Sequence, residues 1–191
     1  MKQKKLAFAG FLLSLTLTQG CTPLLIGGAA ATTAAVAHDR RTTGAVVEDE
    51  AIELRIKSAI SRIPGMSRQT HINVTSYNGI VLLSGQAPSE SLHKTADTVA
   101  RNTRKVKKVH NEITLAAPSA FMVRSSDTLI TSKIKATQLG TIDPTRVKVV
   151  TESGVVYLMG ILSRQEGDIA TERARRVGGV QRVVKLFEYV D

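Results

Sequence analysis

Few residues of this chain could perform chemistry, and the first of them is its only cysteine, Cys21. Without a second cysteine an internal disulfide is impossible, and an exported chain seldom keeps an odd thiol without a use. A free or disulfide-bonded thiol is the alternative. The position of Cys21, where an apolar run gives way to small residues, favours an attachment site.

The segment before Cys21 has the three parts of a secretory signal peptide. Lys2, Lys4 and Lys5 make it positive, residues 6–18 are apolar or hydroxylic, and Gly20 is small. The apolar run is shorter than the about 20 residues that span a bilayer. A buried helix would need a polar face, which this run lacks. We therefore predict a signal peptide over residues 1–20.

Residues 18–21, TQGC, resemble the lipobox of bacterial lipoproteins, in which a diacylglyceryl group joins the cysteine thiol before cleavage. Gly20 fits the small position, whereas Thr18 departs from the usual Leu, with Leu17 one place early. The resemblance implies Cys21 as the lipid attachment site. Thr22, in place of Asp, is the residue that fits sorting to the outer membrane.

No other group of residues indicates catalysis, a metal or a cofactor. The four histidines (His38, His71, His93 and His110) lack the paired spacing of metal ligands. Gly27-Gly28 and Gly178-Gly179 lack the Lys and Ser/Thr of a phosphate-binding loop. The acidic residues 48–50 fit a helix start, where negative charge is favourable. We expect no enzyme activity.

The strongly basic balance of the chain, +10 at pH 7, points to an anionic partner. Removing residues 1–20 takes away three of 26 basic residues and none of 16 acidic ones, which leaves +7. The chain has no Trp and only 4% aromatic residues, so stacking on nucleic-acid bases has little to work with. In an exported lipoprotein the abundant polyanions are phospholipid headgroups.

An internal repeat organises the chain from residue 48 onward. Ile134 follows Ile56 by 78 residues, Gly160 follows Gly85 by 75, and Val183 follows Val109 by 74. A nearly constant offset over three blocks indicates duplication of one structural unit. Residues 21–47, rich in Gly, Ala and Thr, are predicted to be a lipidated tether.

Each unit is predicted to be helix, strand, strand, helix, strand. Apolar residues at helical spacing favour a helix over 49–63, ended by Pro64-Gly65. Asn78-Gly79 predicts a hairpin, and Ser153-Gly154 takes its place in the second unit. Pro88 and the capping-box spacing of residues 163–166 mark the second helices. Two helices on one face of a small sheet give an α+β fold.

Three features resemble the BON domain: this order of elements, the Gly at the end of each hairpin, and the V-x-x-V before each last strand (106–109 and 180–183). Two such domains, 48–116 and 124–191, behind a lipobox and the DRRTTG segment (39–44) resemble the dual BON-domain outer-membrane lipoproteins of the DolP type. The resemblance implies a non-enzymatic, lipid-anchored protein that faces the periplasm, binds anionic phospholipid and supports outer-membrane integrity. Such small units should also pack on each other.

The first helices of the two units differ in charge, which favours the second as the lipid-contacting one. Residues 48–57 carry −2, whereas residues 126–135 carry +1, with Arg124 just before. Leu129 lies off the Ile130–Ile134 stripe, and Lys133 shares its face. An apolar side chain beside cations is typical of interfacial helices. Leu129, Lys133, Lys135 and Arg124 are the predicted phospholipid-binding residues; packing of Leu129 against the other domain is the alternative.

A second basic region lies in the first unit. Lys94, Arg101, Arg104, Lys105, Lys107 and Lys108 stand against Asp97 alone. A charge run often serves only solubility. The competing function is a protein-interaction scaffold of the envelope that docks an acidic partner through this face.

Lipid attachment can be tested by Cys21→Ala. The variant should accumulate as an uncleaved or soluble exported form, because the thiol that carries the lipid is gone. Membrane fractionation measures this. Wild-type recovery of Cys21→Ala with the outer membrane would show that another feature anchors the chain.

Overall fold

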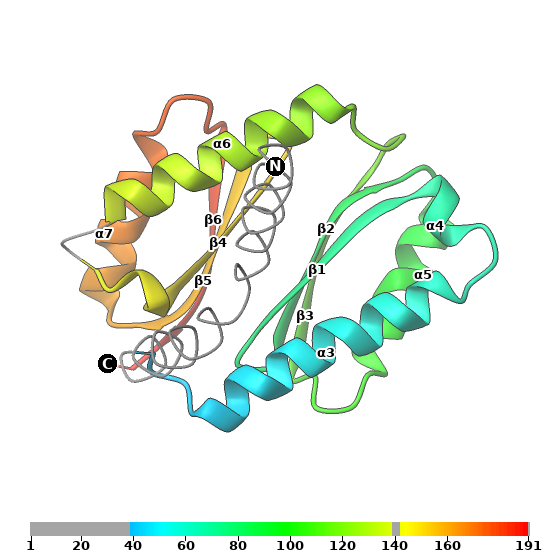
Figure 1. Cartoon of the computed structure of the whole chain (residues 1–191), viewed down its shortest axis with the longest axis horizontal. Coiled ribbons are helices and arrows are strands. Elements are labelled where there is room, and N and C mark those ends of the chain that lie inside the picture. The colour runs from blue at the N-terminus through cyan, green and yellow to red at the C-terminus, as the bar shows by residue number, and fades with distance from the viewer. Residues whose placement is uncertain (1–38, 139–141, 191) are drawn as a thin grey trace, which may run out of the picture. The chain divides into compact units, whose positions relative to one another are not determined.

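A computed structural model describes residues 39–138 and 142–190 (Figure 1). The predicted signal peptide, Cys21, His38 and most of the predicted tether lie outside the described residues. Within the described part of the chain, no helix is long and apolar enough to cross a membrane.

The described chain contains two copies of one arrangement. The first consists of α3 (Thr43–Ser61), α4 (Met66–Gln69), β1 (His71–Tyr77), β2 (Ile80–Ala87), α5 (Glu90–Arg101) and β3 (Lys108–Leu115). The second consists of α6 (Phe121–Gln138), the 3-10 turn η1 (Pro144–Arg146), β4 (Val147–Glu152), β5 (Val155–Leu162), α7 (Arg164–Arg175) and β6 (Arg182–Tyr189). The predicted α+β fold and the predicted order are confirmed; α4 and η1 are additions.

Each copy forms a three-stranded sheet with the hairpin's second strand, β2 or β5, in the middle. The hairpin strands are antiparallel, and both turn residues have positive φ, 53° at Asn78 and 78° at Gly79. Ser153 and Gly154 repeat this geometry at 49° and 75°. The last strand runs parallel to the middle one, so α5 and α7 are the crossovers that parallel pairing requires.

Helix α3 begins earlier than the sequence pattern indicates. It starts at Thr43, and the Thr42 hydroxyl caps it by accepting from the Ala45 N–H at 3.1 Å. The apolar pattern begins only at Ile52, because the first turns of the helix extend beyond the core. Residues 39–47, predicted as tether, therefore belong to the folded part.

Arg41 holds this leading segment on the first copy. Its guanidinium pairs with Asp39 at 2.7 Å and with Asp49 at 2.9 Å, and lies 3.8 Å from the centre of the Tyr77 ring. The neighbouring Arg40 pairs with Glu166 of α7 at 2.6 Å. The segment that leads toward Cys21 thus contacts both copies.

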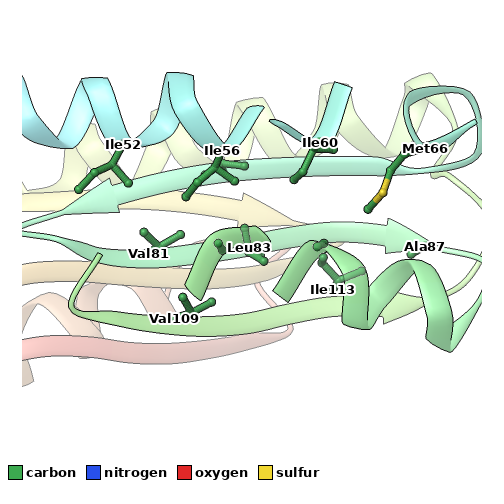
Figure 2. Packing of buried hydrophobic residues seen from close by; sticks show 12 residues of the cluster. Ile52, Ile56, Ile60, Met66, Val81, Leu83, Ala87, Val109 and Ile113 are labelled. Atoms are coloured by element: carbon green, nitrogen blue, oxygen red, sulfur yellow. The ribbon is translucent and has the colours of Figure 1, made fainter. Parts of the chain in front are cut away.

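The core of each copy lies between its two helices and one face of its sheet. In Figure 2, Ile52, Ile56 and Ile60 project from α3 toward Val81 and Leu83 on the sheet. Ala96 and Ala100 of α5 belong to the same cluster, so both helices cover the same face. Ile130, Ile134, Leu158 and Ala170 are among the corresponding residues of the second copy.

The opposite faces of the two sheets pack on each other. A separate buried cluster joins Tyr77 and Leu82 of the first copy to Tyr157, Met159 and Leu186 of the second. Burial raises the pKa of both tyrosines to about 12, so their hydroxyls stay neutral. The four layers are helices, sheet, sheet and helices, and the expected packing of the two small units is confirmed.

Hydrogen bonds at the edges of this interface fix how the two sheets are oriented on each other. Glu152, beside the second hairpin turn, accepts from Asn73 and Gln86 at 2.9 and 2.8 Å, at the far end of the first sheet. Asn78, in the first hairpin turn, donates to Glu188 at 2.8 Å, at the far end of the second sheet. The two hairpin turns consequently lie at opposite ends of the packed sheets.

Glu53 joins the copies through Lys148, which donates to it at 2.9 Å. Burial alone raises the pKa of the Glu53 carboxyl, but the Ser76 N–H, Lys148 and Lys57 outweigh burial and hold this pKa below its ordinary 4.5. Because this pKa is lower in the folded than in the unfolded state, the ionised carboxylate stabilises the fold at pH values above its unfolded pKa. That stability is lost as the pH falls through the folded value.

Glu53→Gln should therefore lower the free energy of unfolding by about 1–3 kcal/mol at neutral pH, because a charge-assisted bond is lost. The difference between the variant and the wild type should shrink as the pH falls below 4.5 and vanish below the folded pKa of Glu53. Urea unfolding at a series of pH values measures both. Glu50→Gln, at an exposed position of the same helix, is the control; an equal loss in both variants would contradict the role of the Lys148 bond.

Candidate functional site

One face of α6 carries the exposed apolar residues of the predicted lipid site. Leu129 is 62% exposed and Met122 is 78% exposed. At about 100° per residue, Met122, Leu129 and Lys133 lie within roughly 40° of one another on the helix surface. We call these three side chains the α6 face. Leu129 is not packed against the other copy, which answers the alternative left open by the sequence.

Lys135 and Arg124 do not share the α6 face. At about 100° per residue they lie roughly 120–140° from Leu129. Both line a cavity of about 480 Å³ together with His71, Thr131 and Glu152. The Arg124 guanidinium donates to the Ser119 carbonyl at 3.0 Å. The four predicted residues are therefore divided between two sides of the helix, two on each.

Met122 was missed by the sequence argument, although it precedes Leu129 by two helical turns. The repeated segment of the second unit begins at residue 126, whereas α6 begins at Phe121. The spacing of seven residues between two apolar side chains outside the core stripe could have revealed it.

Helix α3 also presents exposed apolar residues, which the sequence argument did not recognise. Val47 is 64% exposed and Leu54 is 66% exposed, again seven residues apart. The exposed Glu50 lies one turn before Leu54, on the same side. Leu54 therefore has a carboxylate, Glu50, and an ammonium group, Lys57, one turn away on either side, whereas Leu129 has Lys133 and no acidic neighbour.

A buried carboxylate positions α6 on its sheet. Asp127, 6% exposed, accepts from the Ser153 N–H at 2.7 Å and from the Gly154 N–H at 2.9 Å. It is the only carboxylate of α6, and it is directed away from the α6 face. The helix surface that carries Leu129 and Lys133 therefore holds no acidic side chain.

Asp49 has the same position in the first copy, 78 residues earlier. It accepts from the Asn78 and Gly79 N–H groups at 2.7 and 2.8 Å and from the Ser76 hydroxyl at 2.6 Å. From the sequence alone, residues 48–50 are interpreted as charges at a helix start. That interpretation is wrong for Asp49, which is 3% exposed inside the helix. The repeat offset could have identified both aspartates.

The basic region of the first copy is mostly a loop. Lys94 and Arg101 pair with Glu90 and Asp97 of their own helix at 3.4 and 2.6 Å. Arg104, Lys105, Lys107 and Lys108 are exposed. We call residues 104–108 the basic loop; it follows α5 and ends with Lys108, the first residue of β3.

The three described histidines stand apart. His71 lines the cavity beside Arg124, His93 lies on α5, and His110 lies on β3. Burial, followed by the charge of Lys108, lowers the pKa of His110. Over residues 39–138 and 142–190, no three His, Cys, Asp or Glu side chains come together as metal ligands would.

Sequence comparison places both copies among known domains. The BON domain profile matches residues 48–117 and 126–191. Over 191 residues the chain is 36% identical to the Outer membrane lipoprotein DolP of Haemophilus influenzae, covering 98% of this chain and 97% of that protein.

Two further relatives match over shorter stretches. The chain is 39% identical over 154 residues to the 21 kDa hemolysin of Actinobacillus pleuropneumoniae, covering 80% of this chain and 79% of that protein. It is 33% identical over 145 residues to the Osmotically-inducible protein Y of Escherichia coli, with coverage of 73% and 72%.

Asp127→Ala should lower the free energy of unfolding by about 2–4 kcal/mol, because two backbone N–H groups lose their acceptor at a largely buried site. Urea unfolding measures the loss. Asp168→Ala, at an exposed position of α7, should stay within about 0.5 kcal/mol of the wild type. Similar losses in the two variants would show that the turn does not depend on Asp127.

Proposed function

The chain belongs to the BON-domain family, as a dual BON protein of the DolP type, and from this premise we propose that it is an envelope lipoprotein that binds anionic phospholipid. It is anchored in the outer membrane by lipid on Cys21, faces the periplasm, and supports outer-membrane integrity. The relative named as an outer membrane lipoprotein supports the location, and TQGC at residues 18–21 supports the anchor.

The observation that carries the lipid-binding part is the α6 face. Two exposed apolar side chains, Met122 and Leu129, stand beside Lys133 on a helix surface without a carboxylate. Apolar side chains enter the boundary between headgroups and acyl chains, while a lysine stays with the phosphates. This pattern suits an anionic bilayer surface better than water.

The energies indicate a weak contact. Full burial of a Leu or Met side chain is worth about 1.5–3 kcal/mol, and a lysine at an anionic surface adds about 1 kcal/mol. Because both apolar residues are only partly exposed, the α6 face supplies a few kcal/mol. The anchor at Cys21 makes such a contact effective, since it keeps the domains close to the bilayer.

The competing function is a protein scaffold that docks an acidic partner through the first copy. The observation in its favour is the basic loop, which is exposed and has no acidic residue of its own. Both functions are non-catalytic. They differ in whether a bilayer without protein is bound.

Leu129→Glu with Lys133→Glu should weaken binding to anionic vesicles by at least about tenfold, because it removes one apolar contact and reverses the charge of the α6 face. Neither side chain belongs to the core, so circular dichroism and the unfolding midpoint should stay close to wild type. Co-sedimentation uses the exported chain with Cys21→Ala and vesicles of phosphatidylcholine, with and without an equal amount of phosphatidylserine.

The matched control is Leu54→Glu with Arg62→Glu, an equal charge change at exposed positions of the first copy. It should bind like wild type. Wild-type binding by the α6 variant, or loss of binding by the control alone, would contradict the assignment to α6.

A further inference from the structure

The basic loop differs from its counterpart in the second copy. Residues 104–108 read Arg-Lys-Val-Lys-Lys, whereas residues 178–182 read Gly-Gly-Val-Gln-Arg. All four cations of the loop are exposed. Within residues 39–138 and 142–190, no carboxylate lies within 4.0 Å of Lys105, Lys107 or Lys108, although many other cations of the chain are paired. The fold therefore does not use these charges internally.

The loop is held in place at a conformational cost. Lys105 has φ of 71°, a left-handed conformation that L residues with side chains rarely adopt, while its counterpart is Gly179 at 99°. The Lys107 N–H donates to the Gly79 carbonyl at 2.8 Å, and Arg55 donates to the Arg104 carbonyl at 3.4 Å. A lysine thus stands where the fold itself favours glycine, which points to a use for its charge.

The loop lies at the end of the packed sheets where Arg41, near the start of the described residues, pairs with Asp49. Arg41 pairs with Asp49, Asp49 accepts from the Gly79 N–H, and the Gly79 carbonyl accepts from Lys107. Only two residues therefore separate the leading segment from the loop. The α6 face lies near the second hairpin turn, at the opposite end of the packed sheets.

We propose that the basic loop is a second membrane-binding surface, which contacts an anionic bilayer through charge alone. The inference rests on the proposed function only for the presence of an anionic bilayer, and it involves none of the α6 residues. Its ligand chemistry is a dense layer of lipid phosphates.

A bilayer fits this loop better than an acidic protein does. The loop has no exposed aromatic or large apolar residue, whereas protein interfaces depend on such anchors at their centre. Lysine is also depleted in protein interfaces. A surface of many mobile anions needs no such anchor, and each lysine near it strengthens binding by about fivefold at low salt.

The test compares vesicle binding by two loop variants, again in the exported chain with Cys21→Ala. Lys105→Gln with Lys107→Gln and Lys108→Gln should weaken binding to phosphatidylcholine–phosphatidylserine vesicles by about 100-fold at low salt, with the difference shrinking as salt rises. Lys105→Gly should weaken binding by about fivefold while its unfolding midpoint is no lower than that of the wild type, because glycine suits the positive φ.

The control removes three exposed cations elsewhere: Lys94→Gln with Arg175→Gln and Arg176→Gln. It should keep most of the binding, which would exclude a simple effect of net charge. Equal losses in loop variant and control, or wild-type binding by the loop variant, would overturn the inference and leave an acidic protein as the ligand of the loop.

The outcome is independent of the α6 proposal. If only the α6 variant loses binding, the loop inference is wrong and the proposed α6 contact stands. If only the loop variant loses binding, the α6 assignment is wrong and the loop is the lipid contact.

Discussion

The rest of the structure depends on one interaction that occurs twice: a buried aspartate of the first helix that accepts hydrogen bonds from both N–H groups of a hairpin turn. Asp49 and Asp127 can do this only because both turn residues adopt positive φ and direct their N–H groups toward the helix. A buried carboxylate is costly without donors, and buried turn N–H groups are costly without an acceptor. The carboxylate and the N–H groups satisfy each other and so offset the free-energy cost of burying both. The helix and the hairpin are therefore held in a fixed position relative to each other.

This constraint reaches the surfaces that we assign to membrane contact. Asp127 is directed inward on α6, which leaves Leu129 and Lys133 on the outside without an acidic neighbour. Asp49 holds Gly79, whose carbonyl holds the basic loop, and it also pairs with Arg41 of the leading segment. Because the hairpin turns lie at opposite ends of the packed sheets, the two surfaces also lie at opposite ends.

The sequence pattern predicted what depends on local rules. Asn78-Gly79 predicted a turn with positive φ, and residues 163–166 form the capping box that their spacing indicates. Features that depend on burial by distant residues escaped prediction. Asp49 looked like a surface charge because its four donors come from residues 41 and 76–79. Arg40 and Arg41 looked like tether because their partners lie on both copies. Arg124 and Lys135 were grouped with Leu129 by sequence distance, which does not distinguish the sides of a helix.

Comparison of the two copies separates structural from functional residues without any other sequence. Positions that both copies keep, such as the aspartate and the turn glycine, satisfy the same hydrogen bonds in each and need no further explanation. Positions that differ while the backbone stays the same carry the information about function. Gly179 and Lys105 share a left-handed conformation, and the copy with lysine gives up conformational stability for a charge that no described carboxylate neutralises. Leu129 replaces Ala51 of the first copy, and this exposed apolar residue has Lys133 and no acid on its side of the helix. Duplication thus preserved one folding constraint and left two surfaces free to specialise, one apolar with a cation and one purely basic.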